Sequence, residues 1–98
     1  MSEREIPETL KESVRKVFEE QLGLENLGPK DDHRTYNELD PNADSLDEVE
    51  ILMALEDEFG MEISDEDATR VLSVNDACQY LMENRHRLPK RDSGRWEQ

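Results

Sequence analysis

The sequence predicts an all-α fold, a four-helix bundle with three longer helices, one short third helix and a long loop between helices one and two. Apolar residues recur at spacings of three and four in three separate segments, whereas no segment of useful length alternates as a strand does. A chain of 98 residues has room for one domain with a modest core. We assign this domain to residues 1–84 and treat residues 85–98 as a separate tail.

The first helix is expected at about residues 8–22. Thr9 and Glu12 stand at the spacing of a capping box at its start, and Gly23 ends it. Its buried stripe is predicted to consist of Leu10, Val14, Val17, Phe18 and Leu22.

Residues 23–44 are expected to form a loop, because glycine, proline, asparagine and aspartate interrupt every helical period there. Apolar side chains within the loop should pin it to the core, namely Leu24, Leu27, Tyr36 and Leu39. A loop of this length in a compact domain is often functional.

The second helix is expected over residues 45–59, with Asp44 or Ser45 as its N-cap and Gly60 beyond its end. Its core face is predicted to be Ile51, Leu52, Leu55 and Phe59. Residues 64–67 begin the short third helix, which should bury Ala68 and Val71. The fourth helix opens at Ser73 and Asp76, with the core stripe Val74, Ala77, Cys78 and Leu81.

Residues 85–98 lose the helical period and carry five Lys and Arg against two Asp and Glu. We expect a mobile, partly disordered basic tail beyond Pro89, with Trp96 exposed.

The net charge of −14 at pH 7 excludes several classes of partner, and residues 35–69 alone hold 13 Asp and Glu without any Lys or Arg. This charge repels phosphate backbones and anionic lipid headgroups, so we expect no nucleic-acid partner. No apolar run approaches the roughly 20 residues of a membrane span, and the first five residues are too polar for a secretion signal. We therefore expect a cytoplasmic monomer with no membrane insertion.

A specific metal site is not expected. One cysteine and two histidines are too few for zinc. Asp40, Asn42 and Asp44 match the first ligand positions of an EF-hand loop, but Ser45 replaces its glycine and Ile51 its final glutamate. What remains is weak divalent-cation binding by acidic residues, which relieves their mutual repulsion.

A second apolar row on the helix at 45–59 lies outside its core face and consists of Leu46, Val49 and Met53. Acidic residues crowd around the row: Asp47, Glu48, Glu50, Glu56 and Asp57. The row is either additional core or a docking strip, whose acidic rim steers basic partners and keeps the encounter fast and weak.

Ser45 also has two interpretations. It can cap the helix, or it can carry a modification, because free N–H groups and the helix dipole at a helix start favour a phosphate ester. A catalytic nucleophile is not indicated, since there is no Gly-x-Ser-x-Gly elbow and no general acid, base or metal constellation. We therefore expect no enzymatic activity.

Residues 44–59 read Asp-Ser-Leu-Asp-Glu-Val-Glu-Ile-Leu-Met-Ala-Leu-Glu-Asp-Glu-Phe, and residues 60–68 continue Gly-Met-Glu-Ile-Ser-Asp-Glu-Asp-Ala. This stretch resembles the acyl carrier proteins of dissociated (type II) fatty-acid synthesis. The likeness extends to residues 14–23 and 73–81 and covers roughly residues 8–84.

The resemblance implies that Ser45, between Asp44 and Leu46, receives 4′-phosphopantetheine from coenzyme A through a Mg²⁺-dependent phosphopantetheinyl transferase. The arm's terminal thiol would then carry acyl chains as thioesters between enzymes of fatty-acid or related lipid biosynthesis that offer basic docking patches. The family's partner-recognition positions match Leu46, Val49, Glu50, Met53, Glu56 and Asp57, to which we add Asp47 from the same rim. Small or pliable residues suit a core that admits the acyl chain, namely Ala54, Met61, Ala68, Ala77 and Cys78.

The chain departs from the family in three places. The turn at residues 39–45 is longer than the usual Leu-Gly-Ala-Asp-Ser, Ser64 replaces a common proline, and residues 85–98 extend past the usual end. These departures leave open a specialised carrier for a dedicated lipid, polyketide or peptide pathway, although Ala43-Asp44-Ser45 differs from the Gly-Gly-x-Ser of peptidyl carriers. An unmodified acidic protein-interaction module is a further alternative.

Overall fold

The computed structural model of the protein describes residues 6–84. Across these residues the chain is helical and contains no strand, so the predicted all-α class is confirmed. Three helices are long, as expected: α1 (Glu8–Leu22), α3 (Ser45–Phe59) and α5 (Val74–Glu83). Three elements are single turns: the 3-10 helix η1 (Pro29–Asp31), α2 (Tyr36–Leu39) and α4 (Asp65–Ala68).

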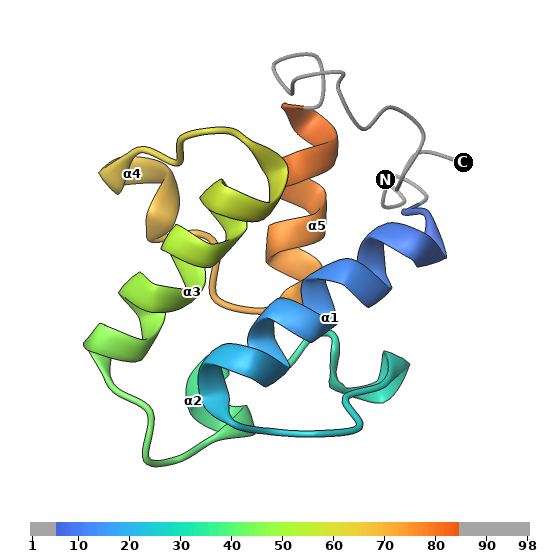
Figure 1. The fold of residues 1–98 in the computed structure, drawn as a ribbon, viewed down its shortest axis with the longest axis vertical. Coiled ribbons are helices and arrows are strands. Elements are labelled where there is room, and N and C mark those ends of the chain that lie inside the picture. Colours follow the sequence, from blue (N-terminus) through green and yellow to red (C-terminus); the bar gives the residue numbers. More distant parts are fainter. Residues whose placement is uncertain (1–5, 85–98) are drawn as a thin grey trace.

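The core lies where α1 packs on both α3 and α5 (Figure 1). Each long helix contributes the stripe that the periodicity predicted, with Phe18, Leu55 and Leu81 each no more than 1% exposed. Leu52 was assigned to the core face but is only partly buried at its edge. None of the helices within residues 6–84 is long and apolar enough to cross a membrane.

The start of α1 differs from the expectation. Thr9 and Glu12 do not form a capping box, because the helix begins at Glu8 and its N-cap is Pro7. The Pro7 carbonyl accepts hydrogen bonds from the N–H groups of Leu10 and Lys11. Proline has no polar side chain that could cap the helix, and Pro7 lies in an extended conformation with φ of −59° and ψ of 140°.

The ends of α1 and α3 follow the prediction. Gly23 (φ 70°) and Gly60 (φ 68°) are both C-caps in the left-handed conformation, which glycine adopts without steric penalty.

The segment between α1 and α3 is more ordered than the predicted loop. Thr35 and Glu38 form a capping box that starts α2, in which each side chain accepts a hydrogen bond from the other residue's N–H. The Tyr36 N–H donates to the Leu72 carbonyl at 2.9 Å, and the Asn75 N–H donates to the Asp32 carbonyl at 2.8 Å. The segment is therefore anchored to the start of α5 through its backbone.

The third predicted helix is α4, which begins after the Ser64 cap as expected. It buries no residue fully: Ala68 is half-buried, and Val71 is buried beyond the helix end. A hydrogen bond from the Tyr80 hydroxyl to the Asp67 carboxylate, 2.9 Å long, links α4 to α5. The predicted basic tail at residues 85–98 lies outside the described residues, as do residues 1–5.

Candidate functional site

Ser45 is the exposed first residue of α3, and the residue before it caps the helix. Asp44 Oδ1 accepts hydrogen bonds from the N–H groups of Leu46 at 3.1 Å and Asp47 at 3.3 Å. Asp47 Oδ2 in turn accepts from the Asp44 N–H at 3.0 Å. Because this capping box satisfies the helix start, the fold does not need the Ser45 hydroxyl as a cap.

The expectation of free N–H groups beside Ser45 is wrong for two of them. The carboxylate of Asp44 already occupies the N–H groups of Leu46 and Asp47. A phosphate ester on Ser45 would gain from the positive end of the α3 dipole, but it would also have the Asp44 side chain as a neighbour. The site therefore suits an exposed, covalently attached phosphate better than a free anion held by backbone donors.

The turn before Ser45 is held by α2 and by its own backbone. The Ala43 N–H donates to the Asp40 carbonyl at 2.8 Å, and the Asn37 side-chain amide donates to the Ala43 carbonyl at 3.2 Å. On the other side of the serine, the Tyr36 hydroxyl donates to Glu48 Oε1 at 3.3 Å. Burial, followed by the charge of Glu48, raises the pKa of Tyr36, which keeps this hydroxyl protonated as a donor.

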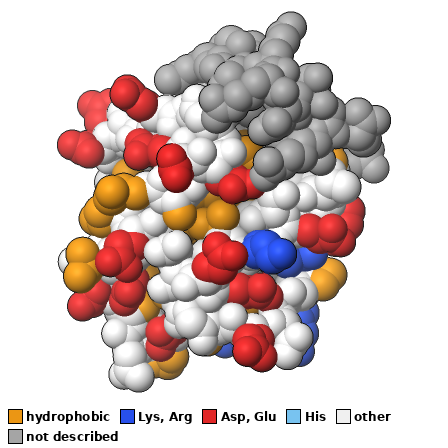
Figure 2. Space-filling model, in the orientation of Figure 1, with side chains coloured by type: hydrophobic (Ala, Val, Ile, Leu, Met, Phe, Trp, Pro, Cys, Tyr) orange, Lys and Arg blue, Asp and Glu red, His pale blue; other side chains and the backbone are white. Residues whose placement is uncertain are grey.

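The second apolar row of α3 is exposed. Leu46, Val49 and Met53 are 63%, 47% and 60% exposed, and they are the exposed large hydrophobic residues within residues 6–84. The interpretation of this row as additional core is therefore wrong. In Figure 2 hydrophobic side chains alternate with acidic ones along the left edge of the molecule, where Figure 1 places α3 and α4.

The acidic residues around this row differ in exposure and in whether they form hydrogen bonds within the fold. Glu50 and Asp57 are exposed, whereas Asp47 is half-buried and bound to Asp44. Glu56 is also half-buried, and its Oε2 accepts a hydrogen bond from the Ile63 N–H at 2.8 Å. Between the end of α1 and α3 lies an open hollow, lined by Gln21, Glu50, Met53, Ala54, Glu56 and Asp57.

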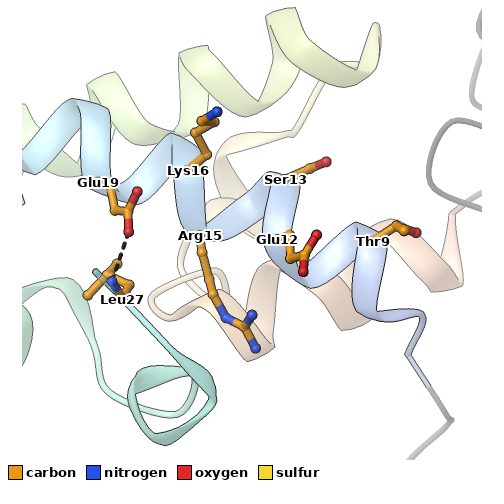
Figure 3. A pocket seen from close by; sticks show the side chains of 7 residues that line it. All are labelled: Thr9, Glu12, Ser13, Arg15, Lys16, Glu19 and Leu27. Carbon is orange, nitrogen blue, oxygen red and sulfur yellow. Dashed lines mark hydrogen bonds between the residues drawn. The ribbon is translucent and has the colours of Figure 1, made fainter. Parts of the chain in front are cut away.

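A second hollow runs along α1 and is shown in Figure 3; it is lined by Thr9, Glu12, Ser13, Arg15, Lys16, Glu19 and Leu27. Two of the lining residues are joined by a hydrogen bond of 2.8 Å from the Leu27 N–H to the Glu19 carboxylate. Acidic and basic residues both line this hollow, and the Arg15 side chain binds two carboxylates that are not part of the lining. The Arg15 guanidinium donates to both carboxylate oxygens of Asp32 at 2.8 Å and to Glu8 at 2.9 Å.

This buried ion pair was not predicted from the sequence. The hydrogen bond to Asp32, followed by the one to Glu8, raises the pKa of Arg15, which stays charged. Cys78 lies near it, and burial raises the pKa of that thiol to about 12, so the thiol is protonated at neutral pH. Among the described residues no three His, Cys, Asp or Glu side chains are placed to hold a metal ion.

The comparison with protein families agrees with this geometry. The family model for the phosphopantetheine attachment site matches residues 12–81, a span that begins in α1, encloses Ser45 and ends in α5. Domains of this family are carriers to which 4′-phosphopantetheine is covalently attached. Since the match covers most of the chain, the protein belongs to the phosphopantetheine attachment-site family.

Proposed function

We propose that Ser45 is the attachment serine, and that the protein carries acyl chains as thioesters between enzymes of fatty-acid or related lipid biosynthesis. The observation that carries the proposal is an exposed hydroxyl at the first position of α3 that the capping box of Asp44 and Asp47 leaves unused. The family match over residues 12–81 and the likeness of residues 44–68 to acyl carrier proteins support it.

The prosthetic arm supplies the terminal thiol that holds the acyl group. The protein supplies the position of that arm: Asp44 fixes the first turn of α3, and Leu46 provides apolar surface next to Ser45. We expect the phosphopantetheinyl transferase and the later partner enzymes to dock on the row Leu46, Val49 and Met53. The free carboxylates of Glu50 and Asp57 would attract basic patches on those enzymes.

Asp47 and Glu56 belong to the same predicted partner face, but each already accepts a hydrogen bond within the fold. Their contribution to docking is therefore expected to be smaller than that of Glu50. For the cargo, the core offers the buried pliable residues Met61, Ala77 and Cys78. Ala54 is partly buried against this core, and Ala68 is half-buried in α4.

The test is the intact mass of the protein after incubation with coenzyme A, Mg²⁺ and a phosphopantetheinyl transferase. Wild type should gain one phosphopantetheine, and Ser45→Ala should gain none. Absence of a gain on wild type would favour the unmodified acidic interaction module. A gain on Ser45→Ala would place the attachment at another residue.

A specialised carrier for a dedicated lipid, polyketide or peptide pathway is the second candidate. The turn before the serine favours it, because Asp40 organises this turn by accepting from the Asn42 and Ala43 N–H groups where the family commonly has a shorter glycine turn. The two candidates are distinguished by offering the loaded protein to elongating enzymes of fatty-acid synthesis. Turnover comparable to that of a housekeeping acyl carrier would exclude the specialised role.

A further inference from the structure

Two neighbouring side chains of α2 contact the α3 entrance on both sides of Ser45. The Asn37 amide donates to the carbonyl of Ala43, two residues before the serine, at 3.2 Å. The Tyr36 hydroxyl donates to Glu48, three residues after the serine, at 3.3 Å. Tyr36 is 9% exposed and belongs to the core, so packing of its ring holds the hydroxyl in one position.

α2 is itself fixed without help from α3. The Tyr36 N–H donates to the Leu72 carbonyl at 2.9 Å, and Thr35 forms an isolated antiparallel bridge with Ser73, the N-cap of α5. The capping box of Thr35 and Glu38 also holds the N-terminus of α2. α2 thus connects the start of α5 to the turn that carries Ser45.

From this arrangement we propose that α2 positions Ser45 for phosphopantetheinylation, with Tyr36 and Asn37 as positioning residues. The inference rests on the proposed function of Ser45. In the transfer, Ser45 Oγ forms a new O–P bond and the pyrophosphate bond of coenzyme A breaks. Adenosine 3′,5′-bisphosphate leaves, and the hydroxyl proton passes to a base on the transferase.

Such a displacement depends strongly on where the attacking oxygen lies, and a misplacement of about 1 Å can cost on the order of 100-fold in rate. The capping box of Asp44 and Asp47 and the hydrogen bond from the Ala43 N–H to Asp40 hold the backbone next to Ser45. Tyr36 and Asn37 fix this entrance relative to α2, so loss of either contact should shift Ser45 slightly without unfolding the turn. The exposed row that we assign to docking makes none of the α2 hydrogen bonds described above. Loss of the α2 contacts should therefore lower kcat of the transferase for this carrier and leave KM unchanged.

The chain offers matched controls. Tyr36→Phe removes the hydroxyl next to the Ser45 turn and keeps the ring. Tyr80→Phe removes the hydroxyl of another buried tyrosine, which donates to Asp67 in α4 rather than to the α3 entrance. Asn37→Asp replaces the donating amide by an acceptor of the same shape. Asn42→Asp makes the same charge change at an exposed position of the turn between α2 and Ser45, where the hydrogen bond to Asp40 comes from the Asn42 backbone.

The experiment measures initial rates of loading against carrier concentration for wild type and the four variants, together with their melting temperatures. We expect kcat to fall roughly three- to tenfold for Tyr36→Phe and for Asn37→Asp, the range that one hydrogen bond supplies. KM should stay within about twofold of wild type. Tyr80→Phe and Asn42→Asp should keep the wild-type kcat, although Tyr80→Phe should lose at least as much thermal stability as Tyr36→Phe, because its hydrogen bond is the shorter one.

Equal kcat for Tyr36→Phe and Tyr80→Phe, or a rise in KM at constant kcat, would overturn the positioning role. Both outcomes assume that wild type is loaded. If wild type is not loaded at all, the failure lies with the proposed function of Ser45 rather than with α2.

Discussion

The buried pair of Arg15 and Asp32 should be a main support of the ordered loop, and Asp32→Ala tests this. The Arg15 Nε and Nη2 atoms each donate to one carboxylate oxygen of Asp32 at 2.8 Å. The side chains of Arg15 and Asp32 are 7% and 8% exposed, whereas Glu8, which binds the third nitrogen, is 57% exposed. The pair joins the middle of α1 to the residue that follows η1.

Removing one partner of a buried ion pair costs about 3–5 kcal/mol, because the remaining charge stays buried without compensation. Glu8 still accepts one hydrogen bond from Arg15, so we expect the lower end, about 3 kcal/mol. That is a large share of the roughly 5–15 kcal/mol that stabilises a small domain. It corresponds to a fall in Tm of at least about 12 °C at this chain length.

The assay is urea unfolding followed by far-ultraviolet circular dichroism at constant ionic strength. Glu8→Ala is the control for an exposed partner of the same arginine and should cost about 0–1 kcal/mol. The double variant Arg15→Met with Asp32→Leu should recover most of the loss, because it leaves no buried charge. Equal losses for Asp32→Ala and Glu8→Ala would refute the assignment of the stability to burial.

Three further predictions concern charge. Millimolar Mg²⁺ or Ca²⁺ at low ionic strength should raise Tm by about 4–8 °C, the equivalent of about 1 kcal/mol of relieved acid repulsion; a Tm that ignores both ions and salt would contradict the repulsion argument. Glu50→Lys should raise the transferase KM several-fold at low salt and less at high salt, with helicity unchanged in circular dichroism, and a constant KM would remove the steering role. The Tyr80 hydroxyl, followed by Arg70, lowers the pKa of Asp67 below 3.8, so the stability that it contributes is complete above that pH and is lost as pH falls through the lowered pKa. Asp67→Asn should therefore be less stable than wild type at pH 6, with a difference that shrinks in unfolding curves measured below about pH 4.

The long elements were predictable because their signals are repeated. The stripe of α1 contains five apolar residues at helical spacing, and all five are buried. Gly23 and Gly60 end α1 and α3 for a local steric reason that is legible in the sequence. The exposed row of α3 was recognised as separate from the core face, but the sequence could not exclude that a neighbour covers it.

The missed features are those without a period or a local partner. α2 is a single turn, too short for a hydrophobic repeat, although the capping-box spacing of Thr35 and Glu38 is a signal that could have located it. Arg15 and Asp32 are 17 residues apart, and no local pattern joins them. The role of Asn37 was not predictable, because its side chain binds the Ala43 carbonyl, which comes near only once the turn has folded.

The arrangement around Ser45 assigns three requirements to different residues. Asp44 and Asp47 satisfy the helix start, so the cap does not use the serine hydroxyl, which we propose is the site of modification. In the proposed function, the exposed row and Glu50 form the docking surface further along α3, where added charge does not disturb the cap. α2 approaches the α3 entrance through Tyr36 and Asn37. Because the proposed docking and positioning roles fall on separate side chains, a carrier of this design could change its partners through its surface while it keeps the same geometry at the proposed attachment serine.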